Sequence, residues 1–321
     1  MLKPEIEDGQ ASLADPAFRH DVLQGFTIRP RAIPARWFYD RRGSELFEAI
    51  TDLPEYYPTR TEAGILRTAC PEVAEIAGAG RAVVEFGSGS STKTPILLDA
   101  VAPSVYVPID ISGDFLRDSS RVLSAQFPDL LVLPFEADFM RPLSLPQTIA
   151  ETPKLGFFPG STLGNFTPDE ALAFLQLSAR LLRGGGLLLG VDLVKDPALL
   201  HAAYNDAQGV TAAFNLNLLR RANAELKTDF DLDGFAHASF YNAPLQRIEM
   251  HLQSRRAQTV TLDGESFDFT EGETIHTEYS HKFTVDGLRA LAEKAGFTPA
   301  TVWTDPDRLF SVHWLQAPAA Q

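Results

Sequence analysis

Short apolar runs alternate with amphipathic stretches through the middle of the chain, from residue 81 to residue 191. The runs are five or six residues long, which is typical of buried strands, and the stretches between them repeat their apolar residues with the period of a helix. The expected strands are 81–86, 105–110, 130–135, 154–158 and 187–191, and the expected helices are 93–101, 115–127 and 169–182. This alternation predicts an α/β fold with a mostly parallel, doubly wound sheet.

The rhythm changes after Asp192. Residues 197–225 have a helical pattern, whereas 238–283 have the pattern of successive antiparallel strands with no helix between them. A helix is again expected over 285–295, and two closing strands are expected over 297–315. The antiparallel segment therefore interrupts an α/β unit that resumes after it.

The segment before the first strand is predicted to contain short helices and loops, followed by a helix over 61–77 that Thr61 could cap. Together with the interruption, this predicts two interleaved domains. The first domain is expected to comprise 61–195 plus 284–321, and the second 1–60 plus 196–283.

Composition narrows the classes of protein. The 321 residues are 45% hydrophobic and 22% charged, which is ordinary for a globular protein and excludes a disordered chain or a coiled coil. Acidic residues number 42 and basic residues 28, so the formal net charge is −14. Nucleic acid and anionic membranes attract basic surfaces, so neither is an expected partner. We interpret the charge as a contribution to solubility.

Cys70 is the single cysteine, so no disulfide can form within the chain, and a reducing cytoplasm is the expected location. The first residues lack the apolar stretch of a signal peptide. The apolar run after Gly186 is broken by Asp192 and Lys195, far short of a membrane span. The seven histidines lack the spacing of a zinc motif, so no metal site is expected.

Three polar groups follow successive predicted strands of the α/β unit. Gly87, Ser88 and Gly89 end the first strand, where glycines let the backbone approach a ligand closely. Asp110 ends the second strand and can accept hydrogen bonds from ribose hydroxyls. Asp138-Phe139 follows the third, and a carboxylate beside a ring suits an adenine base. All three groups are expected at the carboxyl edge of the sheet, where open α/β folds bind ligands.

Each of these signals has an alternative reading. The glycine pair also fits a tight turn without a ligand, because Thr92 stands where a dinucleotide fingerprint has its third glycine. Each aspartate alone also fits a helix cap or a solvated turn. Together, the glycines and the two acids over 82–195 resemble the class I methyltransferases that use S-adenosylmethionine. A kinase is disfavoured because the chain has no phosphate-binding P-loop motif.

A second polar group lies in the antiparallel segment. Glu278 and Ser280 are two residues apart on a predicted strand and therefore face the same side, with Thr277, Tyr279 and His281 on the other. An edge strand in water would show the same pattern.

Other polar and aromatic positions have plain structural interpretations. The alternation around Met250 also fits core packing, and Asn165 also fits a helix cap. Tyr39, Tyr56 and Tyr204 also fit half-buried packing positions.

Motifs along nearly the whole chain, from about residue 20 to 315, resemble the L-histidine Nα-methyltransferases, which make hercynine in the ergothioneine pathway. The motifs are Trp37-Phe-Tyr-Asp, Leu53-Pro-Glu-Tyr-Tyr-Pro-Thr-Arg-Thr-Glu, Gly160-Ser-Thr-Leu-Gly-Asn-Phe-Thr-Pro, Gly190-Val-Asp-Leu-Val-Lys-Asp, Gly209-Val-Thr-Ala-Ala-Phe-Asn, Arg247-Ile-Glu-Met and Thr277-Glu-Tyr-Ser-His-Lys-Phe. The resemblance implies a monomer with a Rossmann-like class I methyltransferase core and a second, α+β substrate-binding domain.

The resemblance also implies roles for individual residues. The implied S-adenosylmethionine-binding residues are Gly87, Ser88, Gly89, Lys93, Asp110, Asp138, Phe139, Gly160 and Ser161. The implied substrate-binding residues are Tyr56, Asn165, Tyr204, Phe214, Met250, Glu278 and Ser280. Glu278 and Ser280 would contact the two imidazole nitrogens, and Glu278 could favour either a charged ring or one neutral tautomer. Tyr39 and Asn165 would lie at the reacting amine, Tyr39 as an orienting group first.

The function implied is trimethylation of the α-amino group of L-histidine, with S-adenosylhomocysteine as the by-product. One alternative is a methyltransferase of the same family that acts on another amino acid or amine, such as tryptophan. A second alternative, from another class, is a module that senses S-adenosylmethionine without turning it over. Retention of Glu278 and Ser280 favours histidine.

Overall fold

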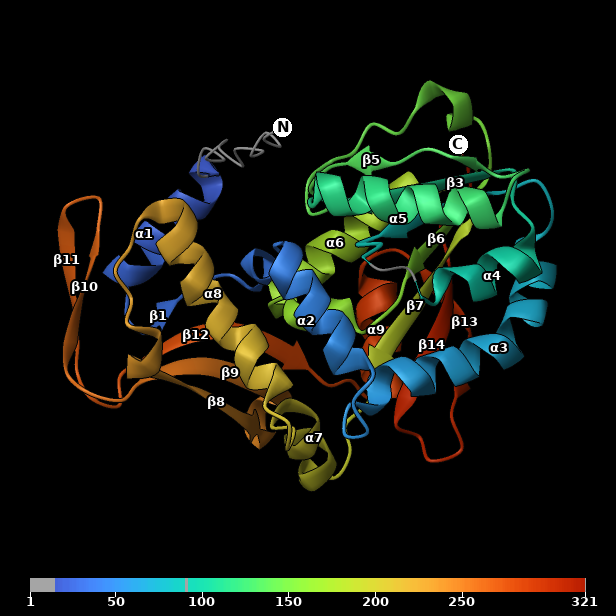
Figure 1. Cartoon of the computed structure of the whole chain (residues 1–321). Coiled ribbons are helices and arrows are strands. Elements are labelled where there is room, and N and C mark those ends of the chain that lie inside the picture. Colours follow the sequence, from blue (N-terminus) through green and yellow to red (C-terminus); the bar gives the residue numbers. More distant parts are fainter. Residues whose placement is uncertain (1–14, 90–91, 321) are drawn as a thin grey trace, which may run out of the picture.

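The structure, a computed structural model, describes residues 15–89 and 92–320 (Figure 1). The first fourteen residues, to which the signal-peptide expectation refers, lie outside the described part, as do Ser90 and Ser91 of the glycine-containing turn. None of the described helices is long and apolar enough to cross a membrane.

Fourteen strands and nine α-helices are formed by the described residues. The helices are α1 (Pro16–Thr27), α2 (Arg41–Thr51), α3 (Tyr57–Ala77), α4 (Thr94–Val101), α5 (Gly113–Gln126), α6 (Pro168–Leu181), α7 (Pro197–Tyr204), α8 (Val210–Leu226) and α9 (Val285–Lys294). The strands are β1 (Arg31–Ala32), β2 (Ala82–Phe86), β3 (Val105–Asp110), β4 (Leu131–Val132), β5 (Phe135–Glu136), β6 (Lys154–Phe158), β7 (Gly186–Asp192), β8 (Phe235–Asn242), β9 (Arg247–Ser254), β10 (Gln258–Leu262), β11 (Glu265–Phe269), β12 (Thr274–His281), β13 (Thr298–Thr304) and β14 (Phe310–Gln316). Two short 3₁₀ turns matter below, η1 (Ala35–Phe38) and η3 (Thr162–Asn165).

Eight strands form the large sheet, in the order β13-β14-β7-β6-β2-β3-β4, with β5 also paired to β3. The strands from β7 to β5 run parallel, whereas β14 is antiparallel to β7 and β13 is antiparallel to β14. The strand order reverses direction at β2, which is the position where open α/β sheets bind ligands. The prediction of a mostly parallel, doubly wound sheet is confirmed.

Helices cover both faces of the large sheet (Figure 1). Alternate residues of β2 face opposite cores: Val84 packs in a core with side chains of α6 and α9, whereas Val83 packs in a core with side chains of α3, α4 and α5. The near-continuous apolar sequence of the central strands follows from this burial on both sides.

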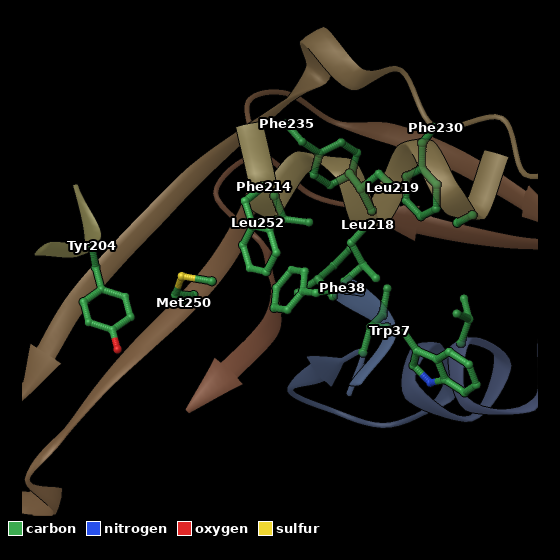
Figure 2. Packing of buried hydrophobic residues seen from close by; sticks show 14 of the residues in the cluster. Trp37, Phe38, Tyr204, Phe214, Leu218, Leu219, Phe230, Phe235, Met250 and Leu252 are labelled. Atoms are coloured by element: carbon green, nitrogen blue, oxygen red, sulfur yellow. The ribbon is translucent and has the colours of Figure 1, made fainter. Parts of the chain in front are cut away.

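Four strands form the small sheet, in the order β1-β12-β9-β8, and β10 and β11 form a separate hairpin. The small sheet shares one core with α1, α2, α7 and α8, drawn from residues 18–57 and 200–275. Phe38 and Phe214 stack in this core with ring centroids 4.5 Å apart, and Figure 2 shows them between α8 and the segment around Trp37. Residues far apart in sequence thus build one compact unit beside the large sheet.

The two sheets meet where β7 and β12 end. The Phe283 N–H donates to the Asp192 carbonyl (2.9 Å), and the Val194 N–H donates to the Phe283 carbonyl (2.9 Å). The chain passes from the large sheet into the small one at this place and returns beside it. The turn η3, which follows β6, packs against the same end of β12, since a methyl group on Gly164 would lie 2.7 Å from the His281 carbonyl oxygen.

Two local predictions were wrong, and one alternative interpretation is excluded. Helix α3 begins at Tyr57 rather than at Thr61, because Pro58 is well suited to the first turn of a helix, where no backbone N–H is needed. The strand expected over 130–135 is split into β4 and β5. Strand β12 is not an edge strand in water, because it lies between β1 and β9.

The close approach of Gly164 to β12 predicts an effect on stability. Gly164→Ala should lower the free energy of unfolding by about 1–3 kcal/mol, because the new methyl group meets the rigid backbone at His281. Gly64→Ala is the matched control: Gly64 is exposed on α3 with no atom within 4 Å of an added methyl group, so stability should rise by about 0.4–1 kcal/mol. Urea unfolding measures both, and equal effects of the two variants would contradict the contact.

Candidate functional site

The glycine-containing turn after β2 meets the carboxylate of Asp110 at the carboxyl edge of the large sheet. Gly87 and Gly89 have φ of +69° and +45°, a region that favours glycine. The Gly89 N–H donates to Asp110 Oδ2 (3.3 Å), and the Ser112 N–H donates to Asp110 Oδ1 (2.9 Å). The first two of the three predicted groups are therefore together, and a methyl group built on Gly89 would meet no described atom within 4 Å.

Phe139 stands beside this turn. A methyl group built on Gly87 would lie 3.5 Å from the Phe139 ring, so that ring borders the glycine backbone. The ring packs on Phe86, Phe158 and Phe174 with centroid separations of 5.8–6.3 Å, which fixes its orientation. A cavity of about 220 Å³ adjoins the ring between residues 141–143 and the end of α6, and neither Gly87 nor Asp110 lines it. The glycine-containing turn, the Asp110 carboxylate and the Phe139 ring thus lie near one another, and their contact with an adenosine stays a prediction.

Asp138 is turned toward its own loop. Its Oδ1 accepts a hydrogen bond from the Met140 N–H (2.9 Å), and its Oδ2 lies 3.4 Å from the Arg141 guanidinium. The Asp138 carboxylate therefore lies at the carboxyl edge of the large sheet, as predicted, and is bound there by the next residues of its own loop. Its contact with a base remains a prediction.

A buried carboxylate from α3 reaches the same edge. Glu62 is fully buried and receives the Lys93 ammonium and the Gly160 N–H, the latter at 2.9 Å from Oε2. It fits against Gly190, where an added methyl group would lie 1.9 Å from Glu62 Oε1. Glu62 thus holds two predicted cofactor residues, Lys93 and Gly160, in one place. Sequence reasoning missed it.

Glu85, the acid that begins the glycine motif, has a structural role. Its carboxylate is buried and accepts hydrogen bonds from Thr94 Oγ1 (2.7 Å) and the Tyr106 hydroxyl (2.6 Å). It thereby ties the start of α4 to β3. Burial raises the pKa of Glu85 to about 7.

Asp192 binds side chains from segments that are far apart in the sequence. Its backbone N–H donates to Ser161 Oγ (2.9 Å), and Ser161 has a φ of +59°. Its carboxylate accepts the Tyr57 hydroxyl (2.7 Å) and lies 2.9 Å from the Lys282 ammonium; Lys195 also pairs with it. All three charged side chains are at most 5% exposed.

The predicted pair on β12 faces the interior of the molecule. Glu278 and Ser280 are buried, and Lys282 continues the same face. Ser280 Oγ accepts hydrogen bonds from the Tyr204 hydroxyl (2.7 Å) and the Lys282 ammonium (2.7 Å). The structure confirms that these two side chains share a face. It adds Lys282 to them, which sequence reasoning missed.

The opposite face of β12 differs from the prediction at Thr277. A bulge puts two steps of β12, from His276 to Glu278, against one step of β9, from His251 to Met250. Thr277 is the extra residue and is buried, with its hydroxyl donating to Asn215 Oδ1 (2.8 Å). Without the bulge, Glu278 would point away from the core that Thr277 enters, because side chains alternate along a strand.

Several aromatic side chains lie near Glu278, since its charge acts on Tyr39, Tyr56 and Tyr204. The Tyr39 ring lies 5.9 Å from Phe214 and 5.7 Å from Phe47, and Phe47 lies 6.3 Å from Tyr56. Met250 pairs with Glu278 across the two strands, and Figure 2 shows Met250 and Tyr204 in the same region of the small sheet. The four predicted aromatic residues, Tyr39, Tyr56, Tyr204 and Phe214, are therefore in one region, and Phe47 is an addition.

Burial sets the protonation of this group. It raises the pKa of Tyr39, Tyr56 and Tyr204 well above the usual range, with the charge of Glu278 adding to each shift. Asp110 also raises the pKa of Tyr39, whose carbonyl accepts a hydrogen bond from Ser112 Oγ (3.1 Å). Tyr39 thus contacts Ser112 at the carboxyl edge of the large sheet and Phe214 in the core of the small sheet. Its phenol keeps its proton near neutral pH.

Glu278 titrates in an unusual range. Burial raises its pKa to about 7, and the positive charge of Lys282 acts in the opposite direction. The carboxylate therefore changes charge close to neutral pH.

Asn165 ends η3, the turn between β6 and α6 that packs against the end of β12. It does not cap α6, because Thr167 does so in a reciprocal pair with Glu170. The alternative structural role is therefore filled by another residue, and the role of Asn165 at the amine stays a prediction.

The missed residues had different signals in the sequence. Glu62 lies three and four residues before Ile65 and Leu66, on the apolar stripe of α3, so its burial could have been noticed. Lys282 lies two residues after Ser280 and continues its face. Asp192 gave no local signal, because its partners come from distant segments. Among residues 15–89 and 92–320, no group of three or more histidine, cysteine or acidic side chains could hold a metal ion.

Comparisons with known proteins agree with this geometry. A family model described as "Histidine-specific methyltransferase, SAM-dependent" matches residues 18–317. The chain is 45% identical over 304 residues to a histidine N-alpha-methyltransferase of Mycolicibacterium smegmatis, covering 92% of this chain and 94% of that protein. It is 41% identical over 300 residues to the histidine N-alpha-methyltransferase of Mycobacterium tuberculosis, with coverages of 90% and 91%.

A more distant relative has a different name. The chain is 26% identical over 332 aligned positions to a 4-dimethylallyltryptophan N-methyltransferase of Claviceps purpurea, covering 94% of this chain and 95% of that protein. The likeness therefore extends over whole chains.

The raised pKa of Glu278 predicts a pH-dependent effect on stability. The buried carboxylate costs nothing while it is protonated, and its cost appears as the pH rises from about 4.5 through about 7. Glu278→Gln should therefore raise the melting temperature, relative to the natural protein, more at pH 8.5 than at pH 5. Thermal unfolding followed by circular dichroism measures both differences. A difference that is the same at the two pH values would show that Glu278 is not held at a raised pKa.

Proposed function

The chain belongs to the S-adenosylmethionine-dependent, histidine-specific methyltransferases, and from that premise we propose that it trimethylates the α-amino group of L-histidine to give hercynine, the first step of ergothioneine biosynthesis. Its large sheet is the Rossmann-like core of a class I methyltransferase. One observation carries the choice of histidine. The buried Glu278 and Ser280 present two polar atoms on one face of β12, which suits a ring with two nitrogens.

The carboxyl edge of the large sheet fits S-adenosylmethionine. In this proposal Asp110 accepts from the ribose, Phe139 and Asp138 flank the adenine, and the amino-acid end reaches the region of Lys93. The whole proposed set is Gly87, Ser88, Gly89, Lys93, Asp110, Asp138, Phe139, Gly160 and Ser161. The bound cofactor supplies an activated methyl group and leaves as S-adenosylhomocysteine.

The small sheet and its neighbours hold the amino acid. Glu278 and Ser280 contact the imidazole, and Met250 packs beside it. Tyr56, Asn165 and Tyr204 hold the amino and carboxylate end. These assignments follow the family resemblance, and the shared location of Tyr204, Met250, Glu278 and Ser280 supports them.

The amine has to be neutral to attack a methyl group, although an α-amino group has an ordinary pKa of about 8. Tyr39 is not its base, because burial keeps the phenol protonated. We assign Tyr39 an orienting role, and Asn165 lies at the same end. The aromatic faces of Tyr39, Tyr56 and Phe214 suit the trimethylammonium group, which has no N–H to donate.

The two-domain division and the state of the enzyme in the cell are part of the proposal. Residues 61–195 plus 284–321 would bind the cofactor and residues 1–60 plus 196–283 the substrate, and the separate cores of the two sheets support this. A cytoplasmic monomer is proposed, with L-histidine as its partner and neither nucleic acid nor a membrane. The single cysteine, Cys70, is buried and free, which suits a reducing compartment.

An acceptor with an indole ring is the second candidate, because one relative is named as a dimethylallyltryptophan methyltransferase. An indole has one N–H and no second ring nitrogen. It would leave unsatisfied either the Glu278 carboxylate or the hydroxyl proton of Ser280 in a buried site, at a cost of about 1–3 kcal/mol. That cost favours histidine.

The direct test of the proposed reaction uses the purified chain with S-adenosylmethionine and L-histidine. Mass spectrometry should show histidine gaining three methyl groups. Tryptophan and histamine, supplied in parallel, should remain largely unmodified. Failure to methylate histidine at any pH from 7 to 9 would refute the proposal, and preferential methylation of tryptophan would establish the second candidate.

A reciprocal pair of variants separates the two binding regions. Asp110→Ala should weaken S-adenosylhomocysteine at least tenfold, because it removes a charged hydrogen-bond acceptor. Glu278→Ala should leave that affinity within twofold and weaken histidine at least tenfold, measured with saturating S-adenosylhomocysteine. Calorimetry gives each constant. Asp118→Ala and Glu75→Ala, at exposed helix positions, are the matched controls and should change neither affinity. Interchanged effects of the two site variants would show that the regions are misassigned.

A further inference from the structure

Lys282 is a buried cation in the proposed substrate region with no role so far. Its side chain is 1% exposed, and its ammonium lies 2.9 Å from Asp192 Oδ2. The same ammonium donates to Ser280 Oγ (2.7 Å) and to the Tyr204 hydroxyl (3.3 Å). Lys282 therefore connects the ionic group around Asp192 with the hydroxyl that would contact the imidazole.

These contacts determine what the Ser280 hydroxyl can do. A serine hydroxyl has two lone pairs that accept and one proton that it donates, whereas an ammonium only donates. Lys282 occupies one lone pair of Ser280 Oγ. The Tyr204 phenol, a better donor than an alcohol, occupies the second. Only the proton of Ser280 remains, so toward a ligand Ser280 is a donor.

Glu278 complements this donor. Ionised, its carboxylate accepts hydrogen bonds and donates none. A neutral imidazole has one N–H, which can donate to the Glu278 carboxylate. Its other nitrogen has a lone pair, which can accept the Ser280 hydroxyl proton. An imidazolium has two N–H groups. One would donate to Glu278, and the other would face the Ser280 hydroxyl proton, so that two donors would meet without an acceptor. The pair therefore matches the neutral ring only.

The charges in the buried group favour the same form. Asp192 carries one negative charge, and Lys195 and Lys282 carry one positive charge each. Ionised Glu278 brings the sum to zero, and a neutral ring leaves it there. An imidazolium would leave an uncompensated positive charge in a buried site, which is costly.

The other titratable groups that face Glu278 do not alter this balance. Tyr39, Tyr56 and Tyr204 all have raised pKa values and stay uncharged. Burial lowers the pKa of Lys195 to about 8, so the ammonium count holds below that pH. Burial raises the pKa of Glu278 to about 7 against the charge of Lys282, and a ring N–H donated to the carboxylate favours its ionised form in the complex.

We propose that Lys282 determines specificity for the charge state of the substrate, because its contact with Ser280 restricts that hydroxyl to donation and so selects the neutral imidazole ring of histidine. This inference rests on the proposed function, since it takes histidine as the ligand of Glu278 and Ser280. Lys282 acts through Ser280 and is a positioning residue.

The test compares two ligands that differ in ring basicity. Histidine and 1,2,4-triazolylalanine have similar shape and the same amino-acid end, but the triazole ring stays unprotonated between pH 6 and 8.5. Calorimetry with the full chain and saturating S-adenosylhomocysteine gives the ratio of their dissociation constants at each pH. Effects of the amine and of protein groups enter both constants and largely cancel in the ratio.

In the natural protein, the dissociation constant of histidine divided by that of the triazole should rise roughly fourfold from pH 7.5 to pH 6. The neutral fraction of a ring with a pKa near 6.5 falls by that factor over this range. In Lys282→Met the ratio should be nearly independent of pH, because a lone pair of Ser280 is released. Lys282→Arg should keep the fourfold change, since arginine also only donates. A purely structural role of Lys282 would instead weaken both ligands equally and leave the pH dependence of the ratio intact.

Bound histidine labelled with ¹⁵N in the ring gives a second readout that needs no variant. At pH 6 its spectrum should show one protonated and one unprotonated nitrogen, although the free amino acid is then mostly imidazolium. Two protonated nitrogens, or a pH-independent ratio in the natural protein, would overturn the inference while histidine still binds. Absence of histidine binding at both pH values would instead refute the proposed function itself.

Discussion

The contacts of Asp192 join the two halves of the molecule. This residue ends β7, the strand after which the chain leaves the large sheet, and its carboxylate is almost fully buried. It receives Tyr57 from the start of α3 and Lys282 from the end of β12, and its backbone binds Ser161. A buried carboxylate is stable only with such partners, since its desolvation is otherwise too costly. The position of the small sheet against the carboxyl edge of the large sheet therefore depends on these hydrogen bonds and ion pairs to the Asp192 carboxylate.

The bulge at Thr277 is a second feature on which the arrangement depends, because it changes which side chains of β12 face the interior. A regular β12 would alternate strictly, and Ile275, which is buried in the core of the small sheet, would share its face with Thr277 rather than Glu278. The extra residue shifts the alternation, so the apolar Ile275 and the acidic Glu278 are buried on the same side of the strand. One face of β12 thus carries core packing at one end and buried polar side chains at the other.

Much of the fold could be predicted from the sequence because its signals are local. The strands from β2 to β7 and the helices between them follow from apolar periodicity, and the polar residues at their ends follow from the parallel arrangement. The pairing of β1 with β12 could not be predicted in this way. Two residues carry no periodicity, and their partners lie about 244 positions away, between Arg31 and Ile275.

The site residues also fall into two groups, those that local spacing predicts and those that it does not. Gly87, Asp110 and Phe139 belong to consecutive strand ends, so spacing alone brings them together. Tyr39, Tyr204 and Glu278 come from three distant segments, and only the family resemblance suggested that they meet. Glu62 and Lys282 were missed because a single charged residue in an apolar pattern usually points to solvent, and its burial depends on partners such as Gly160 and Asp192.

In the proposed reaction, the side chains of the site position the substrate and do not abstract its proton. The tyrosines around the proposed amine position have their pKa values raised by burial, which makes them donors and aromatic walls but not bases. Glu278, the acid that faces them, is directed to the ring and not to the amine in the proposed arrangement. In the proposed reaction the amine then loses its proton to water. Each methyl transfer needs a neutral nitrogen, and in this proposal the site orients that nitrogen for all three transfers without a dedicated base.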